Sequence, residues 1–123
     1  MKLFLLVGLG SFIGGILRFL ISDLIQTKSL SSFPYGTLMV NIIGCFVIGL
    51  IFGWVEKESL SMEWRLFLAT GLIGGFTTYS AFSYETFSLL RDGQILNAMI
   101  YIISTIILGL LATTFGFMIL RWV

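Results

Sequence analysis

Long runs of apolar residues alternate with short polar connections along the chain. A helix needs about 20 mostly apolar residues to cross about 30 Å of hydrocarbon. Four runs reach this length, at residues 3–25, 35–55, 64–90 and 95–122. The pattern therefore predicts an all-α membrane protein with four transmembrane helices, and we expect residues 1–123 to form a single membrane domain.

The three connections between these runs are short and polar. Residues 26–34 end at Pro34, the only proline, which favours a loop that runs into a helix start. Residues 56–63 read E-K-E-S-L-S-M-E, and residues 91–94 contain an Asp-Gly pair that is typical of a tight turn. None of them is long enough to form a site of its own, so we expect the function to reside between the helices.

Composition supports the membrane interpretation. The chain is 58% hydrophobic and 11% charged, and its mean hydropathy is +1.06. A soluble domain carries charge on about a quarter of its residues. The net charge of +1 gives no reason to expect a nucleic-acid partner, and a chain without histidine and with Cys45 as its only cysteine is a poor candidate for a transition-metal site.

Positive charges are divided weakly between the two ends of the predicted bundle. With four spans, both termini and the second connection share one side. The positive residues on that side are Lys2, Lys57, Arg65 and Arg121. The other side carries Lys28 and Arg91, with Arg18 buried nearer to it. Under the positive-inside rule this bias leans toward cytoplasmic termini but permits insertion in both orientations.

Polar side chains within the first two spans need a physical reason, because a central Arg or Asp costs about 2.5–3.5 kcal/mol on insertion scales. Arg18 either extends toward the nearer headgroups or faces a water-filled vestibule that attracts anions. Asn41 either forms an interhelical hydrogen bond or donates to a passing anion. Thr37 lies four residues earlier and shares its helical face.

The third span contains an unusual segment, G-L-I-G-G-F-T-T-Y-S-A-F-S-Y-E, at residues 71–85. A glycine pair that begins at Gly74 and a threonine pair that begins at Thr77 are poor helix sequence. They either allow close packing or mark a third helix that is broken near its middle, with freed carbonyls directed at a cation. Irregular backbone at membrane depth is tolerated only where it is buried or lines a cavity.

Aromatic and hydroxyl side chains line one face in each of the last two spans. Tyr79 and Phe82 are stacked at i, i+3; they either face lipid or offer electropositive ring edges that stabilise an anion without holding it tightly. The fourth span carries a stripe of small and hydroxyl residues. They are Tyr101, Thr105, Gly109, Thr113 and Gly116. This stripe serves either as a packing face or as a pore wall.

Three segments together resemble the Fluc/CrcB family of fluoride channels. They read G-S-F-I-G-G-I-L-R-F in the first span, G-T-L-M-V-N-I-I-G-C-F in the second, and the glycine- and threonine-rich segment described above in the third. The resemblance covers essentially the whole chain. It implies a fluoride-selective channel of the cell inner (plasma) membrane, a multi-pass protein without catalytic residues. Such a channel exports cytoplasmic fluoride down its electrochemical gradient and protects against fluoride toxicity.

The same resemblance implies an assembly of two subunits. Its members form dual-topology dimers of antiparallel subunits, with two fluoride pathways along the interface and a structural Na⁺ at the centre of the interface, on the two-fold axis. The implied partners are the fluoride ion, the lipid bilayer and a second copy of this chain in an antiparallel homodimer. Some members work only as heterodimers, so a paralogous subunit is an alternative partner.

Residue roles follow from the motifs. Asn41 corresponds to the pore asparagine, Tyr79 and Phe82 fill the two places of a phenylalanine box, and the carbonyls of Gly74 and Thr77 correspond to the Na⁺ ligands. The positions that resemble vestibule or polar-track residues are Arg18, Thr37, Ser80, Glu85, Tyr101 and Thr105.

Three departures leave the homodimer and the heterodimer both open. Tyr79 stands where many members have phenylalanine, Ala81 where threonine is common, and Gly109 where some members have a pore serine. A rival of another class is a proton-coupled exporter that resembles the small multidrug resistance family, which needs a titratable carboxylate deep in the membrane. The first span has none before Asp23, and the only other candidate is Glu85. A non-transporting assembly subunit would leave the segment at 74–85 unexplained.

Overall fold

The computed structural model describes residues 1–58 and 60–122, and within them every regular element is helical. The elements are α1 (Lys2–Ser29), α2 (Tyr35–Lys57), α3 (Met62–Arg65), η1 (Leu66–Ile73), α4 (Gly74–Phe76), α5 (Tyr79–Arg91) and α6 (Ile95–Trp122). Four of the segments in this part of the chain are long and apolar enough to cross a membrane, because α3 to α5 together form the third, Met62–Arg91. The prediction of an all-α protein with four such spans is confirmed.

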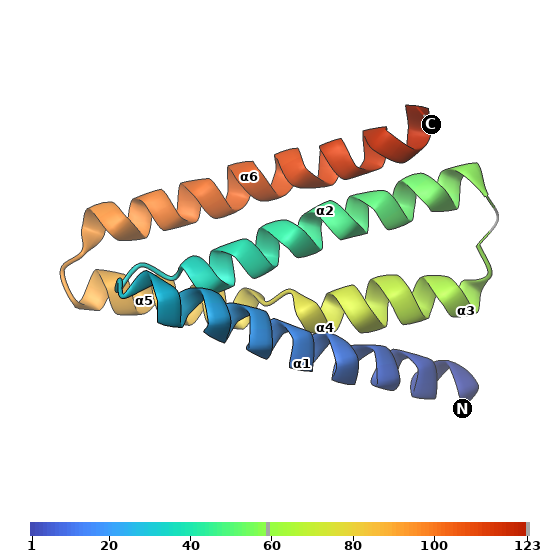
Figure 1. Cartoon of the computed structure of the whole chain (residues 1–123), viewed down its shortest axis with the longest axis horizontal. Coiled ribbons are helices and arrows are strands. Elements are labelled where there is room, and N and C mark those ends of the chain that lie inside the picture. Colours follow the sequence, from blue (N-terminus) through green and yellow to red (C-terminus); the bar gives the residue numbers. More distant parts are fainter. Residues whose placement is uncertain (59, 123) are drawn as a thin grey trace.

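The four spans lie roughly side by side, with three short connections at their ends (Figure 1). Both termini and the connection between α2 and α3 lie at one end of the molecule, and the other two connections lie at the opposite end. Below, the second end is called the loop end; it contains residues 30–34 and 92–94. Many large apolar side chains along the helices are exposed in the single chain, as is expected for helix surfaces that face lipid rather than water.

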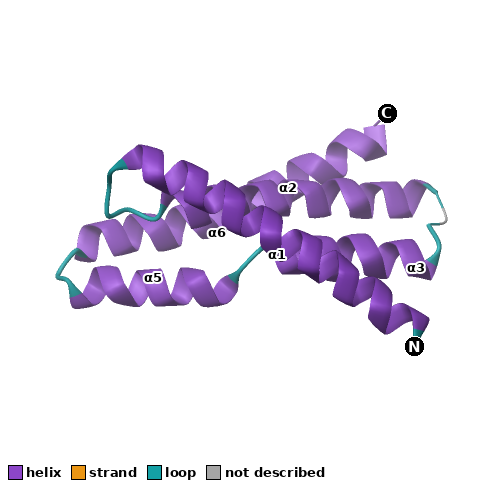
Figure 2. Ribbon diagram, turned by 60° about the horizontal axis from the view of Figure 1, so that its bottom comes forward, coloured by secondary structure: helices purple, strands orange, loops and turns teal. Residues whose placement is uncertain are grey.

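The third span is the least regular of the four. Ser61 caps its first helix, α3, because the Ser61 side chain accepts a hydrogen bond from the Trp64 N–H. After α3 the span continues as a π-helix, η1. After the short helix α4, Thr77 and Thr78 have extended backbone conformations, with ψ of 152° and 119°. Thr78 then caps α5, because its hydroxyl accepts a hydrogen bond from Ala81 N–H at 3.2 Å. Figure 2 shows this non-helical connection at the start of α5.

The sequence places the irregularity at the glycine and threonine pairs, and the extended backbone lies at the threonine pair. Gly74 and Gly75 are helical, and the extended backbone follows two residues later. The glycines have a packing role instead: a Cβ built on Gly75 would lie 2.6 Å from the Ser11 carbonyl oxygen of α1. The π-helical turn before them has no counterpart in the sequence-based prediction.

Packing divides the molecule into two helix pairs. α1 lies mainly against η1 and α4, and α2 lies mainly against α6, which run side by side in Figure 1. Small residues bring the backbones close within each pair, as they commonly do in membrane proteins. A cluster of buried apolar residues joins α2, α5 and α6 near the loop end. It consists of Phe33, Leu38, Leu89, Ala98 and Tyr101, with Ile42 and Phe82 packed against it.

Candidate functional site

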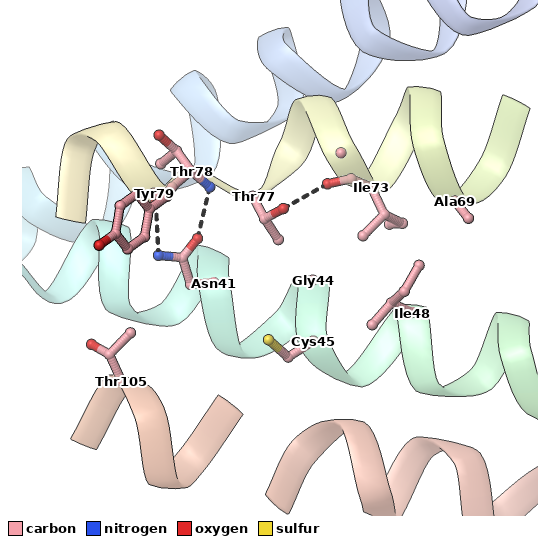
Figure 3. A pocket seen from close by; sticks show the side chains of 11 residues that line it. Asn41, Gly44, Cys45, Ile48, Ala69, Ile73, Thr77, Thr78, Tyr79 and Thr105 are labelled. Carbon is pink, nitrogen blue, oxygen red and sulfur yellow. Dashed lines mark hydrogen bonds between the residues drawn. The ribbon is translucent and has the colours of Figure 1, made fainter. Parts of the chain in front are cut away.

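Asn41 of α2 and the extended residue Thr78 bond each other in both directions (Figure 3). The Thr78 N–H donates to Asn41 Oδ1 at 2.9 Å, and Asn41 Nδ2 donates to the Thr78 carbonyl at 3.2 Å. The amide thus replaces the helical partners that the extended backbone has lost, in a region where unpaired backbone groups are costly. The interhelical hydrogen bond that was one of the two expected roles of Asn41 is therefore present. A primary amide carries two N–H groups, so the second one remains to serve another acceptor.

The Asn41 contact changes the bonding of the carbonyls in α4. In a continuous α-helix the Thr78 N–H would bond the carbonyl of Gly74, four residues earlier. Here that N–H is bonded to Asn41, and both the N–H and the hydroxyl of Thr77 donate to the Ile73 carbonyl, each at 2.9 Å. The Gly74 carbonyl has thereby lost the donor that a regular helix supplies.

Backbone carbonyls of this kind are suitable ligands for a hard cation such as Na⁺, which prefers oxygen ligands. Among the described residues there is no group of three or more His, Cys, Asp or Glu side chains that could hold a metal ion. The Gly74 carbonyl, which lacks its helical hydrogen-bond donor, is an oxygen ligand of the kind that sodium takes. The sodium ion that the sequence resemblance implies, and the part of the Thr77 carbonyl in holding it, stay predictions.

A cavity of about 420 Å³ lies beside this junction, and it is called the Asn41 cavity below. It lies between α2, the third span and α6, as Figure 3 shows, and it is open to the outside of the chain. Five of the predicted site residues line it. They are Asn41, Gly74, Thr77, Tyr79 and Thr105. Tyr79 is 81% exposed in the single chain. Its aromatic ring therefore lies on the surface of the chain, beside the opening of the Asn41 cavity.

A second cavity of about 360 Å³, the Arg18 cavity, lies between α1, α2 and α5. Its lining includes Arg18, Thr37 and Glu85, and Thr78 lines both this cavity and the Asn41 cavity. The Arg18 Nε atom is buried and has no hydrogen-bond partner in the structure. Arg18 therefore lines a cavity together with polar side chains, and its role as a charge in a vestibule stays a prediction.

Glu85 joins three helices at the wall of the Arg18 cavity. The Thr37 hydroxyl of α2 donates to Glu85 Oε1 at 2.6 Å, and the Tyr101 hydroxyl of α6 donates to Oε2 at 2.7 Å. Tyr101 has no exposed surface. Each carboxylate oxygen therefore has a hydroxyl donor, which compensates a charge at membrane depth. The structure brings together three residues that the sequence associates only by motif.

The remaining predicted residues lie close to the residues that line the two cavities. The Phe82 ring lies between those of Tyr79 and Tyr101, with centroid distances of 5.8 Å and 5.2 Å. The Ser80 and Thr78 hydroxyls are 3.2 Å apart. The Thr105 hydroxyl donates to the Tyr101 carbonyl within α6 at 2.7 Å, and Thr105 lines the Asn41 cavity.

Three further residues belong to this arrangement, and the sequence reasoning did not single them out. Thr78 lies between the cavities, Gln26 lines the Arg18 cavity, and Phe33 packs on Tyr101 at 5.6 Å. Gln26 lies eight residues after Arg18, a helical spacing that would have placed both on one face. No comparable signal marks Phe33, because it lies in a connection.

Four helices that are long and apolar enough to cross a membrane, among the described residues, indicate a small multi-pass membrane protein. The chain belongs to the family described as CrcB-like protein, Camphor Resistance (CrcB), whose model matches residues 5–117. The resemblance inferred from the three motifs is confirmed.

Curated relatives match nearly the full length of the chain. A protein of Flavobacterium psychrophilum is 44% identical over 122 residues, covering 98% of each chain. One of Aquifex aeolicus is 46% identical, with 90% of each chain covered, and one of Thermus thermophilus is 43% identical over 95% of this chain and 94% of its own. Each of these three relatives is named a fluoride-specific ion channel, FluC.

Proposed function

We propose that the protein is a fluoride-selective channel that exports cytoplasmic fluoride and so protects the cell against fluoride toxicity. The observation that carries this proposal is the match, over nearly the whole chain, to relatives named as fluoride-specific channels. An inside-negative membrane potential favours the exit of an anion by about 2.3 kcal/mol per charge per 100 mV. A passive pathway in the plasma membrane is therefore sufficient, with no catalytic step and no coupling ion.

The pathway would follow the residues that line or connect the two cavities. In this proposal Arg18 attracts the anion, and the free N–H of Asn41 replaces water as the ion loses its hydration shell. The ring edges of Tyr79 and Phe82 then stabilise it weakly, which allows it to leave again. The hydroxyl groups that accompany this route are those of Thr37, Ser80, Tyr101 and Thr105, with Glu85 as the acceptor that orients two of them.

The structural sodium ion would be held by the carbonyls of Gly74 and Thr77. Its role would be to stabilise the junction between α4 and α5, where helical hydrogen bonds have been exchanged for the Asn41 contact. We accordingly propose that the third transmembrane helix is broken at this junction. Two antiparallel subunits would each contribute such carbonyls to one central ion.

A dimer would complete the site. One chain leaves the Asn41 cavity open and the Tyr79 ring exposed, and a second, antiparallel copy would cover both while keeping the single membrane domain of each chain intact. A heterodimer with a paralogous subunit is the alternative assembly. The comparisons do not favour a proton-coupled exporter, because the relatives carry the name of an ion channel.

Fluoride efflux from liposomes tests the proposal. Purified protein is reconstituted in vesicles loaded with potassium fluoride or potassium chloride, and the external anion is measured with an ion-selective electrode after valinomycin is added. We expect rapid fluoride efflux that requires valinomycin, because each exported anion needs a compensating charge. Chloride efflux at a comparable rate would contradict the selective channel, and fluoride efflux that needs a proton gradient instead of valinomycin would favour the exporter.

A further inference from the structure

Five aromatic rings form a continuous column from the Asn41 cavity to the loop end. The contacts run from Tyr79 to Phe82, from Phe82 to Tyr101, from Tyr101 to Phe33 and from Phe33 to Tyr35. Their centroid distances are 5.8, 5.2, 5.6 and 4.7 Å in that order. Only the first three rings have an assigned place in the proposed pathway, so the contribution of Phe33 is unexplained.

Phe33 is buried although it lies in a connection between two helices. Its side chain is only 8% exposed, and it belongs to the same apolar cluster as Tyr101. Its ring meets the Tyr101 ring edge-on, at an interplanar angle of 77°. Edge-to-face contact is a preferred geometry for aromatic pairs, so it favours one orientation of the Tyr101 ring. On the other side, Tyr101 is in contact with Phe82.

The orientation of Tyr101 decides where its hydroxyl lies. That hydroxyl donates to Glu85 Oε2 at 2.7 Å, and the other carboxylate oxygen accepts from Thr37. If the Tyr101 ring tilted toward the space that Phe33 fills, the hydroxyl would move away from Glu85. The carboxylate would then have one hydroxyl donor in place of two, at the wall of the Arg18 cavity.

Gln26 of α1 holds Phe33 in place through the backbone. Gln26 Nε2 donates to the carbonyls of Ser31 and Phe33 at 2.9 and 3.1 Å, and Gln26 Oε1 accepts from the Gly36 N–H at 3.1 Å. The Phe33 N–H donates to Ser31 Oγ at 3.1 Å. One side chain thus spans the turn that carries Phe33, and the backbone that places the ring against Tyr101 cannot shift without breaking these bonds.

We propose that Phe33 is a positioning residue of the ion pathway: held by Gln26, its ring keeps the Tyr101 hydroxyl on Glu85. This inference rests on the proposed fluoride channel, because it assigns Phe33 an effect on flux. It differs from a purely structural role in one respect. The effect of Phe33 on flux passes through the Tyr101 hydroxyl and disappears when that hydroxyl is absent.

A double-mutant cycle tests this dependence. Valinomycin-dependent fluoride efflux per reconstituted channel is measured for Phe33→Leu, for Tyr101→Phe and for the double variant. Leucine keeps an apolar side chain in the cluster but removes the ring edge. We expect Phe33→Leu to slow efflux by about tenfold in the wild-type background and by less than about twofold in the Tyr101→Phe background. Phe4→Leu, at a site that is 83% exposed, is the matched control and should leave efflux unchanged.

A second variant, at Gln26, disturbs the contact between Phe33 and Tyr101 without changing either ring. Gln26→Leu releases the backbone that carries Phe33 and leaves the ring itself intact, so it should slow efflux with the same dependence on the Tyr101 hydroxyl. It takes the place of Phe33→Leu in the cycle if that variant does not assemble, as judged by size-exclusion chromatography.

The outcomes separate this inference from the function on which it rests. Equal losses in the two backgrounds would show that Phe33 acts only by packing, and would overturn the inference. Wild-type efflux from Phe33→Leu, or from Tyr101→Phe, would overturn it as well, while the channel function would stand. A wild-type protein that passes no fluoride would overturn the proposed function and this inference together.

Discussion

The position of Asn41 allows both of the roles that the sequence presents as alternatives, an interhelical hydrogen bond and donation to an anion. Its oxygen and one of its N–H groups bond both backbone groups of Thr78, while it also lines the Asn41 cavity. An asparagine held on both sides by a fixed backbone presents its remaining N–H at a fixed position. In the proposed pathway, interhelical bonding would therefore hold this donor ready for an anion, and the two expected roles are compatible.

The change Asn41→Asp tests the donor role. The carboxylate can still accept from the Thr78 N–H, but it repels the Thr78 carbonyl and any approaching anion. We expect fluoride efflux to fall by about two orders of magnitude, equivalent to about 2.7 kcal/mol on the barrier, while the assembly survives size-exclusion chromatography. Asn97→Asp is the matched control, because Asn97 bonds only Gln94 near the loop end. An Asn41→Asp protein with normal efflux would mean that the residue acts only as a link between helices.

The two rings near the third-span junction should differ in importance. Phe82 lies between two other rings and is partly buried, whereas Tyr79 is exposed. Phe82→Ile removes an electropositive ring edge, and we expect it to slow fluoride efflux from liposomes by about tenfold, about 1.4 kcal/mol. Tyr79→Phe keeps its ring edge and should be within about twofold of wild type. The reverse order would place the pathway elsewhere.

At the residue scale, sequence reasoning identified polar positions but not their partners. Arg18, Asn41 and Glu85 are conspicuous because charged and amide groups are rare at membrane depth. The partner of Asn41 lies 37 residues away in the chain, and that pairing depends on how two spans pack. The burial of Phe33 was not predicted for a related reason. Whether a residue in a connection is buried depends on tertiary contacts rather than on the local sequence pattern.

At the scale of elements, the apolar pattern predicted where each span lies but not the details of the third. The π-helix η1 lies in a run of apolar residues, where an α-helix would show the same sequence pattern. Hydrophobic periodicity therefore does not distinguish the two. The glycine and threonine pairs together suggested irregular backbone, and the extended residues are the two threonines, Thr77 and Thr78. The glycines are explained by close contact with α1, which no pattern within the third span can show.

Two glycine substitutions measure the importance of that contact. A Cβ on Gly75 would lie 2.6 and 2.7 Å from the carbonyl oxygen and Cα of Ser11, which are backbone atoms that cannot move alone. We expect Gly75→Ala to destabilise the fold by about 1–3 kcal/mol through overpacking, measured by thermal unfolding in detergent. A Cβ on Gly15 meets nothing within 4 Å. Gly15→Ala should therefore be neutral or slightly stabilising, since alanine is the better helix former. Equal melting temperatures for the two variants would contradict the close packing of α1 on α4.

At the scale of the whole molecule, the proposed central sodium ion predicts an ion-dependent stability. An ion that binds only the folded assembly stabilises it by about 2.7 kcal/mol at one hundred times its dissociation constant. We expect the purified dimer to melt at a higher temperature in sodium chloride than in N-methyl-D-glucamine chloride of equal ionic strength. Potassium chloride controls for a general effect of alkali cations. Identical melting curves in all three salts would argue against a sodium site at Gly74 and Thr77.

The arrangement of the ends supports a test of orientation. Both termini and the α2–α3 connection lie at one end of the molecule (Figure 1), as an even number of spans requires. Four positive side chains lie at the end with the termini and two at the loop end, with Arg18 nearer to the loop end. The positive-inside rule therefore gives only a weak bias, which permits insertion in both orientations. This balance is what an antiparallel dimer needs, because half of its subunits must insert each way.

Variants in which positive charge remains at one end only should therefore insert in a single orientation. Each such variant should lose fluoride efflux when expressed alone, and co-expression of two variants with opposite orientations should restore it. One variant, Lys28→Ser with Arg91→Ser, leaves positive charge mainly at the termini and should insert with the termini in the cytoplasm. The opposite variant removes the charges at the other end. Its substitutions are Lys2→Ser, Lys57→Ser, Arg65→Ser and Arg121→Ser. The ion pairs that are lost, Lys2–Glu63 and Arg91–Asp92, are largely exposed and contribute little stability.

Each variant alone should lack antiparallel partners, so cells that express either one should show no fluoride efflux, and co-expression of both should restore it. A C-terminal reporter that is active only in the cytoplasm verifies the two orientations. Efflux is measured with a fluoride electrode on whole cells, with the wild-type chain as the reference. A variant that inserts in one orientation and still conducts alone would show that the channel does not need antiparallel subunits. If instead neither the wild type alone nor the two variants together conduct, while addition of a paralogous subunit restores efflux, the chain is one half of a heterodimer.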